Sequence, residues 1–250
     1  MVPKEYYGRL FTKEQLPVDY HLEAFTLESM IKVDKQLRCK RCYSQIEEDW
    51  QLPEGQYYCR ACIVFGRNQE GKELYYFPSK TSEIEFPVLK WLGELTPYQA
   101  EVSEKLLETY QKQKDSLVHA VTGAGKTEMI YKIVAYVLGN KGRVAIASPR
   151  VDVCRELFLR MQRDFTCSIS LLHAESEPYD GSPLVIATTH QLLKFYQNFD
   201  LVIVDEVDAF PFVGNVMLNH AVEQAKKETG RYIYLTATST LSLEEQVRLG

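Results

Sequence analysis

The feature that most constrains this chain is a short glycine-bearing loop, Ala-Val-Thr-Gly-Ala-Gly-Lys-Thr, at residues 120–127. It follows a short, mostly apolar run at residues 117–120 and leads into a helix-like stretch at residues 127–138. A strand, a glycine-bearing loop and a helix in this order are the context that a phosphate-binding P-loop requires. The loop therefore predicts an α/β fold with a phosphate site at the end of a strand.

The residue types in this loop suit the phosphates of a nucleotide. Glycines at positions 123 and 125 let the backbone approach phosphate oxygens and turn its N–H groups toward them. Lys126 would supply a positive charge for the β- and γ-phosphates, and the Thr127 hydroxyl would ligate Mg²⁺. Ala120 stands where the usual pattern has its first glycine, so a glycine-rich turn that merely precedes Lys-Thr is the alternative. The nucleotide-binding residues predicted here are Thr122, Gly123, Ala124, Gly125, Lys126 and Thr127.

An acidic motif follows a wholly apolar run at residues 201–204. In an α/β sheet the carboxyl end of a strand faces the nucleotide. Asp205 is predicted to hold Mg²⁺ through water, and Glu206 to act as the general base that activates the attacking water. Solvated acids at a strand end are the alternative. Together with Lys126 and Thr127, the motif predicts an ATPase in which two neighbouring strand ends bring these pairs onto one magnesium-bound triphosphate.

Two further positions fit a nucleotide site. Gln99 lies near the start of a helix predicted for residues 96–110, and its carboxamide can both donate to and accept from an adenine edge. Thr236 and Thr238 follow the last apolar strand. Their hydroxyls are predicted to relay the state of the γ-phosphate to a neighbouring surface.

Two pairs of cysteines, Cys39 with Cys42 and Cys59 with Cys62, are separated by sixteen residues. This spacing fits a Cys₄ zinc site, in which each pair places two thiolates on one metal. Because the protein supplies all four ligands, the zinc should be structural and contribute on the order of 10 kcal/mol to the folding of so small a module. Disulfides are the alternative, which the missing export signal disfavours.

Basic residues surround both cysteine pairs, and such a cluster can hold the phosphates of a nucleic acid strand. A solvated surface that stabilises the thiolates is an alternative of equal weight. Because the net charge of the chain is −5, any contact with nucleic acid must come from local patches of this kind. The basic residues are Lys32, Lys35, Arg38, Lys40, Arg41, Arg60 and Arg67.

The length of 250 residues, with 45% hydrophobic and 25% charged residues, is typical of a soluble globular protein. We expect an N-terminal region at residues 1–88, which contains the zinc module at residues 39–62, and an ATP-binding domain at residues 89–250. Apolar residues among the first 36 positions predict a short helix and some packing. No apolar stretch is long enough to span a bilayer, and the N-terminus lacks the apolar region of a secretory signal. We therefore expect a cytoplasmic protein without membrane insertion that could dock at the inner face of the membrane.

Taken together, these motifs resemble those of superfamily 2 helicases and translocases of the DEAD/DEAH kind. The matching stretches are Thr96–Gln99, Thr122–Thr127, Ser148–Arg150, Thr188–Leu192, Asp205–Asp208 and Thr236–Thr238. The resemblance implies a RecA-like P-loop domain with a mostly parallel sheet. It also implies that the chain grips a nucleic acid backbone with Pro149, Arg150, Thr188, Thr189 and His190. Motors of this kind have a second RecA-like lobe that supplies an arginine finger, and we expect the present residues without it to hydrolyse nucleotide very slowly.

The four cysteines ahead of the motor core resemble the ComFA family of bacterial late-competence ATPases, which drives or assists the entry of single-stranded DNA in natural transformation. The resemblance implies Zn²⁺, Mg²⁺ and ATP as cofactors, and single-stranded DNA and proteins like ComFC, DprA and ComEC as partners. A PriA-like replication-restart helicase is an alternative, although PriA carries its zinc cysteines after the first motor lobe. An RNA helicase of the DEAD/DEAH kind is another, and a zinc-dependent scaffold with a regulatory nucleotide site is a third.

Overall fold

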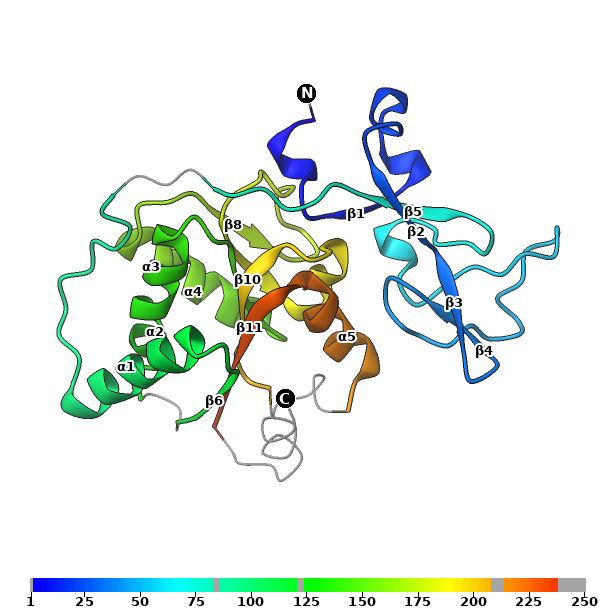
Figure 1. Cartoon of the computed structure of the whole chain (residues 1–250). Helices are drawn as coiled ribbons and strands as arrows, with labels where there is room; N and C mark the ends of the chain where they lie inside the picture. The colour runs from blue at the N-terminus through cyan, green and yellow to red at the C-terminus, as the bar shows by residue number, and fades with distance from the viewer. Residues whose placement is uncertain (1, 83–85, 121–123, 208–213, 238–250) are drawn as a thin grey trace.

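The centre of the computed structural model is a six-stranded parallel sheet, which with its covering helices we call the α/β lobe (Figure 1). The structure describes residues 2–82, 86–120, 124–207 and 214–237. The strand order is β6-β11-β10-β7-β9-β8, and neighbouring strands are parallel. The strands are β6 (Ser116–His119), β7 (Val144–Ser148), β8 (Ile169–Leu172), β9 (Leu184–Thr188), β10 (Phe199–Val204) and β11 (Lys226–Thr236).

Alternating side chains along the central strands build two separate cores. In β7, Val144 and Ile146 belong to one cluster of buried residues, whereas Ala145 and Ala147 belong to the other. Strands β9 and β10 alternate in the same way. Strands that are covered on both faces need apolar side chains on both, which is why they read as continuous apolar runs in the sequence. The predicted α/β class with a mostly parallel sheet is confirmed.

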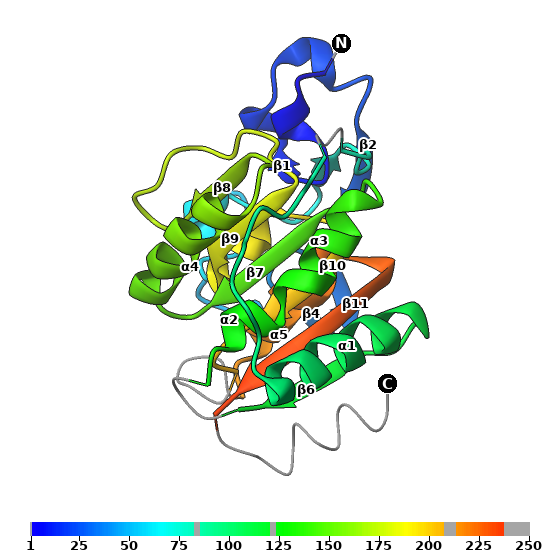
Figure 2. The same cartoon turned by 90° about the vertical axis from the view of Figure 1, so that its left-hand side faces the viewer.

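The helices cover the two faces of the sheet unequally. Helices α1, α3 and α4 lie on one face (Figure 2), while α5 and the 3₁₀ turn η5 lie on the other. Their bounds are α1 (Pro97–Gln111), α2 (Lys126–Met129), α3 (Tyr131–Gly139), α4 (Val151–Asp164), α5 (Val216–Ala225) and η5 (Thr189–Lys194). Helix α1 begins at the predicted place because Thr96 and Gln99 form a capping box. Within the described residues, no helix is long and apolar enough to cross a membrane.

Short strands form the N-terminal region. The three-stranded antiparallel sheet has the order β1-β5-β2, and β3 pairs with β4 in a separate ribbon. The elements are η1 (Lys4–Tyr6), β1 (Leu10–Thr12), η2 (Lys13–Gln15), η3 (Val18–Tyr20), β2 (Phe25–Glu28), β3 (Met30–Val33), β4 (Gln36–Cys39), η4 (Ile63–Phe65) and β5 (Glu73–Tyr76). Within the described part of the first 36 residues, the helical turns are the 3₁₀ helices η1, η2 and η3, and the longer elements are strands where the sequence predicted a short helix. The reason is non-local, because β1 and β2 both pair with β5 from beyond the cysteines.

The segment around Val88, which connects the N-terminal region to the α/β lobe, packs on that lobe. Val88 is 5% exposed and lies in the core cluster that includes residues of α3 and α4. Its carbonyl accepts a hydrogen bond from the Thr166 N–H at 3.0 Å, and the Lys90 N–H donates to the Asp164 carbonyl at 2.8 Å. A domain boundary near residue 88 stays a prediction, and the contacts of Val88 itself are made with the lobe.

Candidate functional site

The carboxyl edge of the parallel sheet gathers the predicted motifs. Strand β6 leads toward the P-loop, β10 ends directly before Asp205 and Glu206, and β7 ends before Pro149 and Arg150. Strand β9 leads into η5 at the same edge. Parallel strands place all their carboxyl ends together, so residues far apart in the chain meet there. In the P-loop, Thr122 and Gly123 lie outside the described residues.

Lys126 and Asp205 face each other across this edge. Lys126 Nζ lies 3.6 Å from Asp205 Oδ1, and both side chains are 14% exposed. The expectation that the two motifs follow neighbouring strands is wrong, because β11 lies between β6 and β10. Strands β6 and β10 are thus two inter-strand spacings of about 4.8 Å apart, and the Lys126 side chain nevertheless reaches Asp205.

Glu206 adopts a left-handed backbone conformation with a φ of 56°, which is uncommon for a residue other than glycine. Its N–H donates to Asp205 Oδ1 at 2.9 Å, which orients that carboxylate. Oε1 of Glu206 lies 3.6 Å from Arg150 Nη1, whereas Oε2 is buried and has no hydrogen-bond partner among the described residues. Burial raises the pKa of Glu206 above that of an ordinary glutamate, and Arg150 opposes this shift. A desolvated carboxylate with one free oxygen is suited to accept a proton.

The Gln99 carboxamide is bonded within the protein, where it joins α1 to the P-loop. Its Nε2 donates to the Ala124 carbonyl at 2.9 Å, and its Oε1 accepts from the Thr96 N–H at 2.9 Å. Gly125 has a φ of +74°, and a Cβ at this position would lie 2.3 Å from Gln99 Nε2. The backbone conformation therefore favours glycine, and an added Cβ would also force the Gln99 amide to move. Recognition of adenine by Gln99 stays a prediction, because both polar ends of its amide serve the protein in this structure.

We expect Gly125→Ala to weaken nucleotide binding about tenfold or more. With alanine, the free loop would relax out of the left-handed conformation, and binding would have to restore it at about 1–2 kcal/mol, which corresponds to about tenfold in affinity; the added Cβ would also displace Gln99. Titration with a fluorescent nucleotide measures the effect. Gly71→Ala is the matched control, since Gly71 has a φ of +75° with nothing within 4 Å of the added carbon. An unchanged dissociation constant in a folded Gly125→Ala protein would contradict the prediction.

The residues predicted to grip a nucleic acid strand differ in accessibility. Arg150 and His190 are exposed and Pro149 is half-buried, whereas Thr188 and Thr189 are buried. Thr189 is 0% exposed, so its side chain is not accessible to a ligand in this conformation. Arg150 and His190 follow β7 and β9, which are adjacent strands. Contact with nucleic acid stays a prediction, for which Arg150 and His190 are the accessible candidates.

Thr236 connects the end of β11 to the start of the P-loop. Its side chain is 0% exposed, and its carbonyl accepts a hydrogen bond from the Ala120 N–H at 3.0 Å. The next residue, Ala237, places its carbonyl 3.1 Å from His119 Nε2. Thr238 lies outside the described residues, so the relay assigned to the two threonines stays a prediction.

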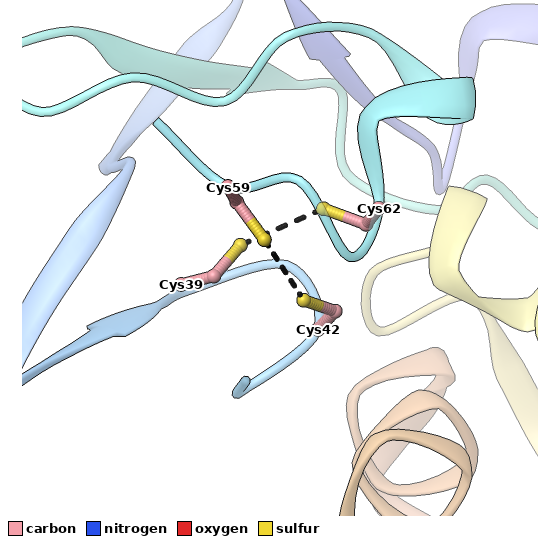
Figure 3. Close-up of side chains that lie close together, drawn as sticks. All are labelled: Cys39, Cys42, Cys59 and Cys62. Carbon is pink, nitrogen blue, oxygen red and sulfur yellow. Dashed lines mark hydrogen bonds between the residues drawn. The ribbon is translucent and has the colours of Figure 1, made fainter. Parts of the chain in front are cut away.

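The four cysteine sulfurs meet at one point between the two cysteine loops (Figure 3). The Sγ atoms of Cys39 and Cys62 are 3.6 Å apart, those of Cys42 and Cys59 are 3.5 Å apart, and all four lie within 4.8 Å of one another. A tetrahedron with metal–sulfur bonds of about 2.3 Å has edges of about 3.8 Å. The cluster is therefore compatible with a zinc ion held by four thiolates.

Groups around the cysteines also fit an anionic metal centre. Asn68 Nδ2 donates to Cys39 Sγ at 3.1 Å and to the Ser29 carbonyl at 2.7 Å, which fixes that ligand from outside. Arg41 is fully buried, and its Nη1 donates to the Gly66 carbonyl at 2.8 Å, while its Nε and Nη2 have no partner within the described part of the chain. Four thiolates around Zn²⁺ carry two net negative charges, which would balance this buried guanidinium. Arg41 is therefore not part of the basic surface that the sequence suggested for nucleic acid.

The four thiols influence one another's protonation. Hydrogen bonds from Cys42, Cys59 and the remaining thiol lower the pKa of Cys39, whereas Cys39 and the other thiols raise the pKa of Cys62. One thiolate can be stabilised only by neighbours that keep their protons. Binding of a metal by all four would thus release protons.

The zinc module docks on the face of the lobe that α5 and η5 form (Figure 1). The ring of Tyr43 stacks on His220 with centroids 5.1 Å apart, and His220 Nε2 lies 3.1 Å from the Lys40 carbonyl. On η5, Lys194 Nζ lies 5.7 Å from the ring centre of Phe65. Neither α5 nor this interface was predicted from the sequence. The signal was present, because the buried residues of α5 recur at helical spacing: Leu218, Ala221, Val222 and Ala225.

Comparison with known proteins agrees with this geometry. The competence protein ComFA of Streptococcus pneumoniae (strain ATCC BAA-255 / R6) is 57% identical over 249 residues, which cover 98% of this chain and 57% of that protein. The chain thus spans little more than half the length of this relative. The replication restart protein PriA of Synechocystis sp. (strain ATCC 27184 / PCC 6803 / Kazusa) is 29% identical over 124 residues, which cover 45% of this chain and 15% of that protein.

The comparison extends to fold and family. The solved structure of the DEAD-box helicase Mss116 bound to ssRNA and UDP-BeF matches with a TM-score of 0.50 at 16% identity, over 62% of this chain and 38% of that one, which is a likeness of fold alone. A family model described as DEAD/DEAH box helicase matches residues 96–246. That span takes in more than half of the chain and the whole edge at which Lys126, Asp205 and Glu206 meet. The chain belongs to the DEAD/DEAH box helicase family.

Proposed function

We propose that this chain forms the zinc module and ATP-binding lobe of an ATPase that single-stranded DNA stimulates and that assists DNA uptake in natural transformation. The observation that carries the proposal is the 3.6 Å approach of Lys126 Nζ to Asp205 Oδ1 at the carboxyl edge of the sheet. Beside this pair, Glu206 offers a buried oxygen for which no described residue is a partner. A helicase-family domain of this kind is a nucleotide-hydrolysing one.

The chemistry that we propose for this edge is hydrolysis of a magnesium-bound triphosphate. Lys126 exchanges its contact with Asp205 for oxygens of the β- and γ-phosphates. The released Asp205 carboxylate and the Thr127 hydroxyl would hold Mg²⁺, which would neutralise phosphate charge when bound. Glu206 accepts through Oε2 the proton of the water that attacks the γ-phosphorus, and ADP and phosphate are the products.

The reach of the sequence similarity favours DNA uptake over replication restart. Similarity to the competence protein ComFA runs through 98% of the chain and so takes in the cysteines, whereas similarity to two PriA proteins covers 45% and 62% of the chain. In the proposal, Arg150 and His190 hold backbone phosphates, so binding is sensitive to salt and tolerant of sequence. Partners like ComFC, DprA and ComEC and a position at the cytoplasmic face of the membrane belong to the same proposal.

The test is ATP hydrolysis by the complete natural protein with and without nucleic acid. We expect single-stranded DNA to raise the rate about tenfold or more, equivalent to about 1.4 kcal/mol of barrier, and RNA of equal length to leave it near the DNA-free rate. Stimulation should weaken as salt rises. Preferential stimulation by RNA would instead support an RNA helicase, and stimulation restricted to branched DNA would support a replication-restart helicase. Nucleotide binding without hydrolysis would support the scaffold with a regulatory nucleotide site.

A further inference from the structure

The Arg150 guanidinium contacts two carboxylates at once. Its Nε and Nη2 form a fork with Asp152, at 3.2 Å to Oδ1 and 2.5 Å to Oδ2. The remaining nitrogen, Nη1, lies 3.6 Å from Glu206 Oε1. The side chain of Arg150 is nevertheless 54% exposed, so a ligand can reach it from solvent. Arg150 therefore joins the exposed surface to the carboxylate at the nucleotide edge.

Two adjacent strands hold this pair in place. Strand β7 precedes Arg150 and strand β10 precedes Glu206, and the two strands are hydrogen-bonded neighbours. The Asp205 N–H donates to the Ala147 carbonyl at 2.8 Å, which continues the pairing beyond the end of β10. Arg150 also occupies the N-cap position of α4, where its carbonyl accepts a hydrogen bond from the Cys154 N–H at 3.1 Å, so its backbone is anchored on both sides. The contact thus links two rigid elements and does not depend on a loop alone.

From this arrangement we infer that Arg150 is a positioning residue that couples occupancy of the nucleic-acid site to ATP hydrolysis through its ion pair with Glu206. Without a strand, Arg150 holds Glu206 Oε1 in place, and its positive charge beside the carboxylate opposes proton uptake at Oε2. A backbone phosphate can accept two hydrogen bonds from the guanidinium, as the Asp152 carboxylate does in this structure. Arg150 then leaves Glu206, and Oε2 takes the proton of the attacking water without that opposing charge nearby. The inference rests on the proposed function, since it assumes hydrolysis and strand binding at this edge.

The decisive variant is Arg150→Gln in the complete natural protein. We expect its DNA-free rate of hydrolysis to rise about two- to fivefold, the range that an exposed ion pair of this kind supports. At saturating single-stranded DNA, the ratio of the stimulated to the DNA-free rate should fall toward one. If Arg150 only binds the strand, Arg150→Gln would need a higher DNA concentration for half-saturation. At saturating DNA it would still reach the wild-type ratio of the stimulated to the DNA-free rate. That outcome, with an unchanged DNA-free rate, overturns the inference.

Two further variants separate the alternatives. Arg155→Gln removes one positive charge from an exposed position on the same helix, and we expect both rates to stay near those of the wild type. Asp152→Asn removes the fork but leaves Glu206 in place, so the DNA-free rate should not rise and half-saturation should occur at lower DNA concentration. A rise as large as that in Arg150→Gln would assign the effect to Asp152 and overturn the inference.

Failure of the inference differs from failure of the proposed function. If DNA never stimulates the wild-type protein, the proposed function fails. Comparing the DNA-free rates of Arg150→Gln and the wild type still tests whether the ion pair with Arg150 restrains Glu206, because no nucleic acid is present in that comparison. An increased rate there supports the ion pair as a restraint, and an unchanged rate overturns it.

Discussion

Lys126→Ala is expected to lower the rate of ATP hydrolysis about a thousandfold, equivalent to about 4 kcal/mol of transition-state stabilisation. The physical reason is that Lys126 Nζ lies 3.6 Å from Asp205 Oδ1 in a site where both side chains are only 14% exposed. A fixed charge in such a poorly solvated place acts on developing phosphate charge more strongly than it would in water. Phosphate release by the complete natural protein, measured at saturating ATP, checks the prediction.

Lys132→Ala provides the matched control for this experiment. Lys132 lies on α3 and pairs with Glu104, and these side chains are 48% and 55% exposed. An exposed pair of this kind contributes about 0–1 kcal/mol, so the control should keep close to the wild-type rate. Thermal unfolding of both variants shows whether they remain folded. A folded Lys126→Ala protein that hydrolyses ATP within about tenfold of the wild type would refute the assignment of Lys126 to phosphate stabilisation.

Loss of the metal is expected to unfold the zinc module. In Cys59→Ala, zinc bound per chain should fall from one equivalent to none, because one of the four clustered ligands is missing. A structural zinc site contributes on the order of 10 kcal/mol at neutral pH, which exceeds what so small a module can supply by packing. All four cysteines are 0% exposed and belong to the core cluster that includes Leu218 of α5, so loosening should reach the lobe face as well. Metal analysis and hydrogen exchange of peptides from residues 30–75 measure both effects.

Cys167→Ala is the control for the zinc experiment. Cys167 lies outside the cysteine cluster and is neither fully buried nor fully exposed, so its replacement should leave zinc content unchanged. A strong chelator applied to the wild-type protein should reproduce the loss of protection seen in Cys59→Ala. If the chelated protein keeps its full protection at residues 30–75, the metal does not stabilise the module and the zinc assignment is wrong.

The predictions that the structure confirms came from local sequence patterns. The two Cys-x₂-Cys pairs predicted a cluster, and their sulfurs meet within 4.8 Å. The apolar runs predicted buried strands, and β7, β9 and β10 are each covered on both faces. Thr96 as a cap and Pro97 at the first helical position predicted the start of α1. Each of these signals depends on residues a few positions apart, whose geometry the backbone itself dictates.

Contacts between distant segments escaped prediction. Nothing near Glu206 in the chain indicates that Arg150 pairs with it, and no local signal shows that Thr189 is buried or that Arg41 turns inward to the cysteine loops. The docking of Tyr43 on His220 is likewise invisible to motif analysis. These contacts follow from how the elements pack, which depends on the whole chain.

The sequence by itself determined that this chain has a P-loop, an acidic pair at a strand end and a four-cysteine module, because each is encoded within one short stretch of the chain. The tertiary structure alone decided that β11 separates the strands of the two nucleotide motifs and that β1 and β2 flank β5. It also decided that the zinc module rests on α5 and η5. Strand order and docking are set by the burial of apolar faces across the whole chain, and that energy has no signature in any short stretch of sequence.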